Sequence, residues 1–80
     1  MPISLRAAAL RTALERAVDA PARLLAVEHG MRVYATAPDP SDTAAWERAM
    51  SALRSADRWG STTASGVPEI WAEVHDEVSP

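Results

Sequence analysis

The chain has 80 residues and a formal net charge of −3, and it contains no cysteine. That length suits one domain, spanning 1–80 with a frayed tail at 76–80, and lies near the size at which a single apolar core barely suffices. The absence of cysteine excludes a disulfide framework, a thiolate nucleophile and a cysteine-based zinc site. No apolar run approaches the ~18 residues of a membrane span, so we expect a cytoplasmic protein with no membrane contact.

Composition and charge are both uneven along the chain. Alanine supplies 17 of the 38 apolar residues, and all eight basic residues are arginine, a usage typical of high-GC coding as in actinobacteria. Five arginines against three acids give residues 1–33 a net charge of +2, whereas three arginines against eight acids give residues 34–80 a net charge of −5. We therefore expect a thin core of small residues and a dipolar, solvated surface.

The first helix is predicted over residues 5–18, with Ser4 as its cap. At about 100° per residue, one arc of this helix collects apolar side chains and the opposite arc collects polar ones. The apolar arc consists of Ala7, Ala9, Leu10, Ala13, Leu14, Ala17 and Val18. This narrow, alanine-lined stripe permits close approach to a sheet or another helix. The helix ends before Pro21, since the residue preceding a proline is pushed away from helical geometry.

Residues 22–37 allow two interpretations. The preferred one is a hairpin with a two-residue turn at His29-Gly30. Its expected pairs are Val27 with Arg32, Ala26 with Val33, Leu25 with Tyr34 and Leu24 with Ala35. The other interpretation is a helix that has Pro21 at its first position and stops at Gly30. A strand over residues 31–36 follows in either case.

The segment 39–42 predicts the start of a second helix, because it combines a capping acid, proline at the first helical position and an acid in the first turn. This helix is expected to run to about Ala56. Its apolar face carries Trp46, Ala49, Met50 and Leu53, and the opposite face carries Glu47, Arg48, Ser51, Arg54 and Ser55. Truncating a buried tryptophan typically costs ~3–5 kcal/mol, so Trp46→Ala should unfold the chain. If Arg48→Ala were damaging and Trp46→Ala tolerated, the interaction surface would lie on this helix.

Two further strands are predicted over residues 59–63 and 67–75, with a turn at Ala64-Ser65-Gly66. In the second strand, Ile70, Ala72 and Val74 alternate with Glu69, Trp71, Glu73 and His75. A two-residue Ser65-Gly66 turn sets Trp71 opposite Gly60, over which its ring can pack. Trp71 therefore either covers Gly60 or belongs to an exposed patch.

The resulting order αββαββ predicts an α+β fold with a four-stranded antiparallel sheet and two helices on one face. This is the order that a ferredoxin-like βαββαβ chain would have if its first strand were moved to the end. If residues 22–29 are helical, the alternative is ααβαββ, a three-helix, winged-helix-like domain. The expected core consists of Leu10, Leu14, Val33, Trp46, Met50, Leu53, Trp59 and Ile70, with Trp59 closing its bottom.

No group of residues carries a catalytic or metal-binding signature. Neither His29 nor His75 has a local motif that pairs it with a serine nucleophile. Glu73 with 75–77 (His-Asp-Glu) forms the only metal-like cluster, but its ligands are nearly consecutive and close to a terminus. The stretch 61–66 has one glycine, no lysine and no following helix, so it fails the phosphate-loop pattern. We expect no metal, no cofactor and no enzymatic activity.

The leading hypothesis is a non-enzymatic protein-interaction module, homodimeric through the open sheet face or an edge strand. Its candidate interface consists of Leu25, Val27, Arg32, Tyr34 and Trp71. Aromatic residues exposed on a small domain are typical of protein interfaces, and this domain has few large residues to form a core. The hypothesis leaves the identity of any partner open.

The alternative hypothesis is a small regulatory nucleic-acid-binding protein. It relies on the arginine excess before residue 34, on the first helix, and on Arg32, Tyr34 and Trp71, which could stack on single-stranded bases. Against it stand the acidic neighbours of Trp71 and the net charge of −5 beyond residue 33. The runs 56–60 (Ala-Asp-Arg-Trp-Gly) and 69–74 (Glu-Ile-Trp-Ala-Glu-Val) resemble small actinobacterial proteins of unknown function, a likeness that implies no activity.

Overall fold

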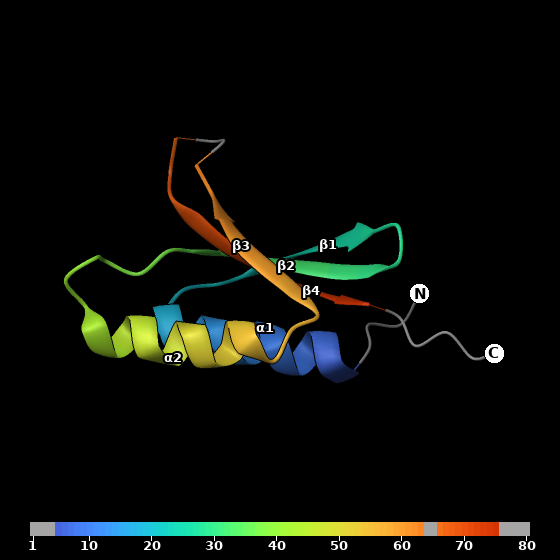
Figure 1. Cartoon of the computed structure of the whole chain (residues 1–80), viewed down its shortest axis with the longest axis horizontal. Helices are drawn as coiled ribbons and strands as arrows, with labels where there is room; N and C mark the ends of the chain where they lie inside the picture. The colour runs from blue at the N-terminus through green and yellow to red at the C-terminus, as the bar shows by residue number, and fades with distance from the viewer. Residues whose placement is uncertain (1–4, 64–65, 76–80) are drawn as a thin grey trace.

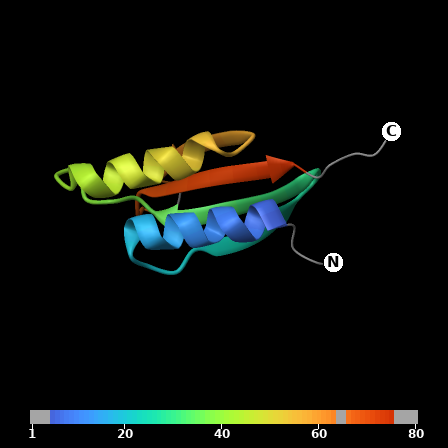
Figure 2. The ribbon, with the colours of Figure 1, turned by 90° about the horizontal axis from the view of Figure 1, so that it is seen from below.

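The computed structural model describes residues 5–63 and 66–75, and it confirms the α+β fold. The elements are α1 (Leu5–Val18), β1 (Arg23–Val27), β2 (Gly30–Thr36), α2 (Thr43–Arg54), β3 (Arg58–Thr62) and β4 (Glu69–His75). All strand pairs are antiparallel, in the order β1-β2-β4-β3. Both helices lie side by side on one face of the sheet (Figures 1 and 2).

This strand order is that of a ferredoxin-like βαββαβ sheet whose first strand has been moved to the end of the chain. The ααβαββ alternative is wrong, because β1 forms where it required a helix. Each hairpin supplies one edge strand and one central strand, so β2 and β4 form the middle of the sheet. The two helices bury their apolar faces against this middle and against each other.

α1 ends where the sequence predicts, and its last turn explains why. Asp19 adopts a left-handed conformation with φ 53°, which aspartate tolerates better than most residues. The Glu15 carboxylate accepts a hydrogen bond of 2.9 Å from the Ala22 N–H and holds the chain as it turns toward β1. Pro21 lies between them and prevents another helical turn. The predicted cap Ser4 lies outside the described residues.

The β1–β2 hairpin forms with a register two residues away from the predicted one. Val27 pairs with Gly30, so the two-residue loop is Glu28-His29. Gly30 is paired within the sheet, at a position where β4 approaches so closely that a Cβ would overlap the Val74 carbonyl oxygen. Only glycine permits this close approach of the two backbones. A shift of two residues leaves every side chain on its predicted face.

α2 begins later than predicted. Its N-cap is Asp42, whose carboxylate accepts a 3.0 Å hydrogen bond from the Ala45 N–H. Asp39 instead accepts hydrogen bonds from the N–H and hydroxyl of Ser41, at 2.9 and 2.6 Å, and these bonds lower the pKa of Asp39. The start at Pro40 is therefore wrong: the first acid closes a turn before the helix, and the second caps it.

The core lies between the helices and the sheet and is rich in alanine. Its larger buried residues are Leu10, Leu14, Val33, Leu53, Ile70 and Val74. The other buried apolar residues are Ala7, Ala17, Ala22, Ala35, Ala45, Ala49, Ala52 and Ala72. Small side chains on both helices allow their backbones to approach closely, which gives a thin helical layer.

None of the three tryptophans is fully buried, which corrects the expected core. Trp46 and Met50 are partly buried against its rim, because α2 directs its alanines and Leu53 inward. Trp59 is 46% exposed, so it does not close the core. It lies on β3, an edge strand, where no second element covers it from the side. Trp46 is only partly buried, so Trp46→Ala removes less buried apolar area than the loss of a fully buried tryptophan would. The unfolding predicted from the sequence is therefore no longer expected.

Candidate protein interface

The face of the sheet opposite the helices is open and carries the predicted interface. Strand pairing aligns its side chains in rows across the sheet. One row is Leu25, Arg32, Glu73 and Arg58, and the next is Arg23, Tyr34, Trp71 and Gly60. Val27 lies at the end of the sheet, opposite Gly30. Sequence alternation predicted this face, and the hairpin turns align the rows.

Trp71 covers Gly60, as the predicted β3–β4 register requires. A Cβ on Gly60 would lie 2.9 Å from Cζ2 of the indole. The Arg32 guanidinium stacks over the same indole, with Cζ 4.2 Å from the ring centroid. Contacts with both neighbouring strands leave the ring only partly exposed. A stacked guanidinium on a half-buried indole is a favourable cation–π contact.

Glu73 organises the centre of this face, although it is only 6% exposed. Its Oε1 accepts hydrogen bonds from Nε and Nη2 of Arg32, at 3.0 and 2.6 Å, and its Oε2 lies 2.7 Å from Nε2 of His75. The hydrogen bonds from Arg32, and then from His75, lower the pKa of Glu73. Hydrogen bonds to Tyr34 and to Glu73 raise the pKa of Arg32. The geometry therefore favours the charged form of both partners.

A second pair repeats the arrangement at the other end of the face. Nη2 of Arg23 lies 2.9 and 3.1 Å from the two carboxylate oxygens of Glu69. The Arg23 guanidinium also lies 5.1 Å from the centroid of the Tyr34 ring. Each of these arginines thus contacts both an acid and an aromatic ring. A phosphate group would have to displace a carboxylate to bind either of them, which argues against the nucleic-acid hypothesis on this face.

The five predicted interface residues therefore separate into two groups. Arg32, Tyr34 and Trp71 are brought together, but they are partly buried by their contacts with one another and with Glu73. Leu25 is 53% exposed at the edge strand β1. Val27 lines a pocket of about 290 Å³ at the end of the sheet, together with Glu28, His29, Arg32, Arg58, Glu73 and His75.

Each of the two histidine rings lies beside a carboxylate. The His75 ring contacts Glu73, and the exposed His29 ring lies 3.9 Å from Glu28. Within residues 5–63 and 66–75, no three metal-ligating side chains gather. Asp76 and Glu77 of the predicted metal-like cluster lie outside the described residues.

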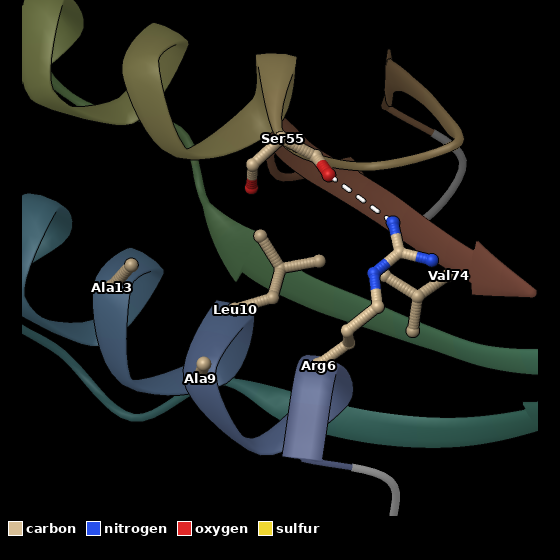
Figure 3. Close-up of a pocket in the computed structure, with 6 residues that line it drawn as sticks. All are labelled: Arg6, Ala9, Leu10, Ala13, Ser55 and Val74. Carbon is tan, nitrogen blue, oxygen red and sulfur yellow. Dashed lines mark hydrogen bonds between the residues drawn. The ribbon is translucent and has the colours of Figure 1, made fainter.

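Asp57 joins the helical layer to the end of the sheet. Its Oδ2 accepts a 2.7 Å hydrogen bond from the His75 N–H and a 3.1 Å bond from Nη1 of Arg6. The bond from the His75 N–H is the larger cause of the lowered pKa of Asp57, and the bond from Arg6 follows. Arg6 also donates to the Ser55 carbonyl at 3.3 Å, across a shallow groove between α1 and α2 (Figure 3). That groove is lined by Arg6, Ala9, Leu10, Ala13, Ser55 and Val74.

A further surface lies on the side of α2, the helix that the sequence analysis named as the place of the interface only if Trp46→Ala were tolerated. We call it the α2 flank and define it by the residues that line one groove: Thr43, Trp46, Glu47, Met50 and Arg54. Trp59 is exposed on β3, the strand that follows α2 and contacts it. The available signal was the spacing 43, 47, 50 and 54, which repeats at intervals of four and three residues as in helix–helix seams. The helical projection placed Trp46 with the core residues Ala49 and Leu53, so this spacing was not interpreted as a surface.

No family model, no curated protein and no solved structure matches this chain. Among the described residues, no helix combines the length and the apolar character needed to cross a membrane. Any functional conclusion therefore depends on the surfaces described above.

Proposed function

We propose that this chain is a non-enzymatic protein-interaction module that forms a homodimer. The observation that carries the proposal is the placement of its large apolar side chains. Leu25 is 53% exposed and Trp59 is 46% exposed, whereas alanines occupy much of the core. A domain of this size buries little apolar surface, so large apolar residues that stay exposed do not contribute to its stability. A second protein surface that covers them recovers that burial.

The edges of the sheet support the same proposal. β1 and β3 are edge strands, and each presents one side of its backbone to no other strand of the sheet. Such edges pair readily with other chains unless charge, proline or a bulge blocks them. β1 and β3 contain no proline, each contains one arginine, and each carries an exposed large apolar residue, Leu25 on β1 and Trp59 on β3. The absence of proline and the exposed apolar side chains favour association at both edges, and the one arginine in each strand opposes it.

Sedimentation velocity over ~1–200 µM, a range that brackets weak to moderate dimer affinities, tests the proposal. We expect the average mass to rise from the 8.6 kDa of one chain toward twice that value as concentration increases. A single species of one-chain mass over the whole range would contradict the homodimer.

A titration with a mixed DNA and RNA pool at low salt tests the alternative in the same instrument. We expect no complex. Binding tighter than ~10 µM that weakens as salt is added would favour the nucleic-acid hypothesis instead.

A further inference from the structure

The α2 flank combines apolar and charged side chains along one side of a helix. Trp46 and Met50 are partly buried at its base, and Glu47 and Arg54 are exposed beside them. The alanine face of α2, which packs on the core, is a different face of the helix. α2 and β3 both lie on the near side of the molecule in Figure 1, so one partner can contact both.

The charges of the α2 flank differ from those of the sheet face. Within residues 5–63 and 66–75, neither Glu47 nor Arg54 belongs to an ion pair. Arg23 and Arg32, in contrast, are both paired with carboxylates. Glu47 and Arg54 are therefore available to an external partner without loss of an internal contact.

Glu47 and Arg54 are placed so that two copies of α2 related by a two-fold axis can pair opposite charges. Glu47 and Arg54 lie equally far from the midpoint of the helix segment, between Met50 and Ser51. If a second α2 packs antiparallel across a two-fold axis at that midpoint, Glu47 of each copy faces Arg54 of the other. At ~1.5 Å per residue the two charges are about 10 Å apart along the axis, so both pairs form together.

We propose that the α2 flank binds a second copy of this chain, with the two α2 helices antiparallel. This inference rests on the proposed homodimer and names its interface. Met50 lies next to the axis, the two Glu47–Arg54 pairs lie on either side of it and determine the orientation, and Trp46 adds apolar contact outside the pairs. Trp59 extends the contact along β3. The partner is a second copy of this chain, because the same two residues, Glu47 and Arg54, supply both halves of each ion pair.

The size of the contact indicates its strength. α2 has 12 residues and is ~18 Å long, so two such helices bury less than the ~800 Å² per partner of a standard interface. Trp59 and the open edge of β3 add to that area. We therefore expect a dimer with a dissociation constant in the micromolar range.

Reversing the charges one at a time and then together tests this geometry. Glu47→Arg places like charges opposite Arg54 of the other copy, and Arg54→Glu does the same for Glu47. Each single change should weaken the dimer about tenfold or more. The double variant exchanges the two charges and restores both pairs, so its dissociation constant should return to within ~threefold of the wild-type value.

Arg48→Glu is the matched control, because it makes the same charge change on α2 at a position that lines a different groove. It should leave the dimer unchanged. All the substituted residues are exposed, and circular dichroism checks that each variant is folded. Sedimentation velocity measures the dissociation constants.

The outcomes separate this inference from the proposed function. A wild-type dimer that is insensitive to both single reversals would overturn the α2 interface and leave the homodimer standing. Single reversals that weaken the dimer without recovery in the double variant would overturn the antiparallel arrangement. A wild-type chain that stays monomeric up to ~200 µM would overturn both.

Discussion

The open sheet face and the α2 flank both display aromatic and charged side chains, but they differ in what those side chains already contact. On the sheet face, Trp71 lies against Gly60 and Arg32, and Glu73 accepts hydrogen bonds from Arg32. On the α2 flank, Trp46 lies beside a groove whose charged residues have no ion pair in the described part of the chain. On the first surface Arg32 already contacts both Trp71 and Glu73, whereas on the second Glu47 and Arg54 form no ion pair among the described residues.

The difference teaches that residue type and strand alternation do not by themselves identify an interface. Cross-strand neighbours on a sheet lie about 5 Å apart, so aromatic and charged residues in adjacent rows readily satisfy one another. Side chains on the outer side of a helix have fewer neighbours in other elements. A polar or aromatic residue there is therefore more available to another molecule.

The largest effect is expected from Glu73, which holds the sheet face together. Glu73→Gln removes the negative charge that Arg32 and His75 contact, and it should cost about 2 kcal/mol at neutral pH, since Glu73 is nearly buried. Urea unfolding measures this loss. Glu47→Gln is the control, and it should change the free energy of unfolding by less than ~0.5 kcal/mol because Glu47 is exposed.

We also expect the difference in stability between the wild type and Glu73→Gln to depend on pH. The folded state lowers the pKa of Glu73 from its ordinary value of 4.5. Its contribution to stability is therefore complete above that value and is lost as pH falls through the folded pKa. The difference in stability between wild type and Glu73→Gln should shrink as the pH is lowered from about 5. A difference that stayed constant down to pH 2 would show that the charge of Glu73 contributes nothing.

A smaller effect is expected at Gly60, beneath the Trp71 ring. Gly60→Val places a branched side chain where even a Cβ would lie 2.9 Å from the indole. The ring must move away from Gly60 and from Arg32, at a cost of about 1–2 kcal/mol. Valine is otherwise favoured over glycine in strands, so destabilisation would be specific to this contact. Near-ultraviolet circular dichroism should show the change in the surroundings of the indole.

Ser61→Val is the matched control for that substitution. It adds the same side chain at an exposed position next along β3, on the other face of the sheet. It should be neutral or slightly stabilising. Equal destabilisation by both variants would mean that β3 does not tolerate valine, and the Trp71 contact would not be the cause.

The smallest effect is expected at Leu25, the exposed member of the sheet face. Leu25→Ser should change the free energy of unfolding by less than ~0.5 kcal/mol, because the side chain is more than half exposed. It should also leave the dimer intact, since Leu25 is on β1, the edge opposite β3. A dimer that dissociates in this variant would move the interface to the sheet face, and sedimentation velocity distinguishes the two results.

Several features of the candidate surfaces could be predicted because they depend on neighbours in the sequence. Alternation in residues 69–75 places Trp71 and Glu73 on the outer face, and the predicted pairing of Trp71 with Gly60 is confirmed. Ala64 and Ser65 of the predicted turn lie outside the described residues. The register of the first hairpin could not be predicted in this way. His29-Gly30 is a good turn sequence, but Gly30 is needed where β4 approaches β2. That requirement arises from a strand more than 40 residues away.

By itself, the sequence predicted the two helices, the later strands and an α+β fold, because local periodicity, prolines and capping residues act over a few residues. It left residues 22–29 open between a strand and a helix, and the structure shows the strand β1. Only the tertiary structure decided which residues remain available to a partner. The rotation of α2 about its axis depends on which face packs best against α1 and the sheet, and alanines fit there better than Trp46. Likewise, Arg23 and Arg32 on the sheet face are paired because the order β1-β2-β4-β3 places Glu69 and Glu73 next to β2. Both results depend on contacts between distant segments, which no local pattern encodes.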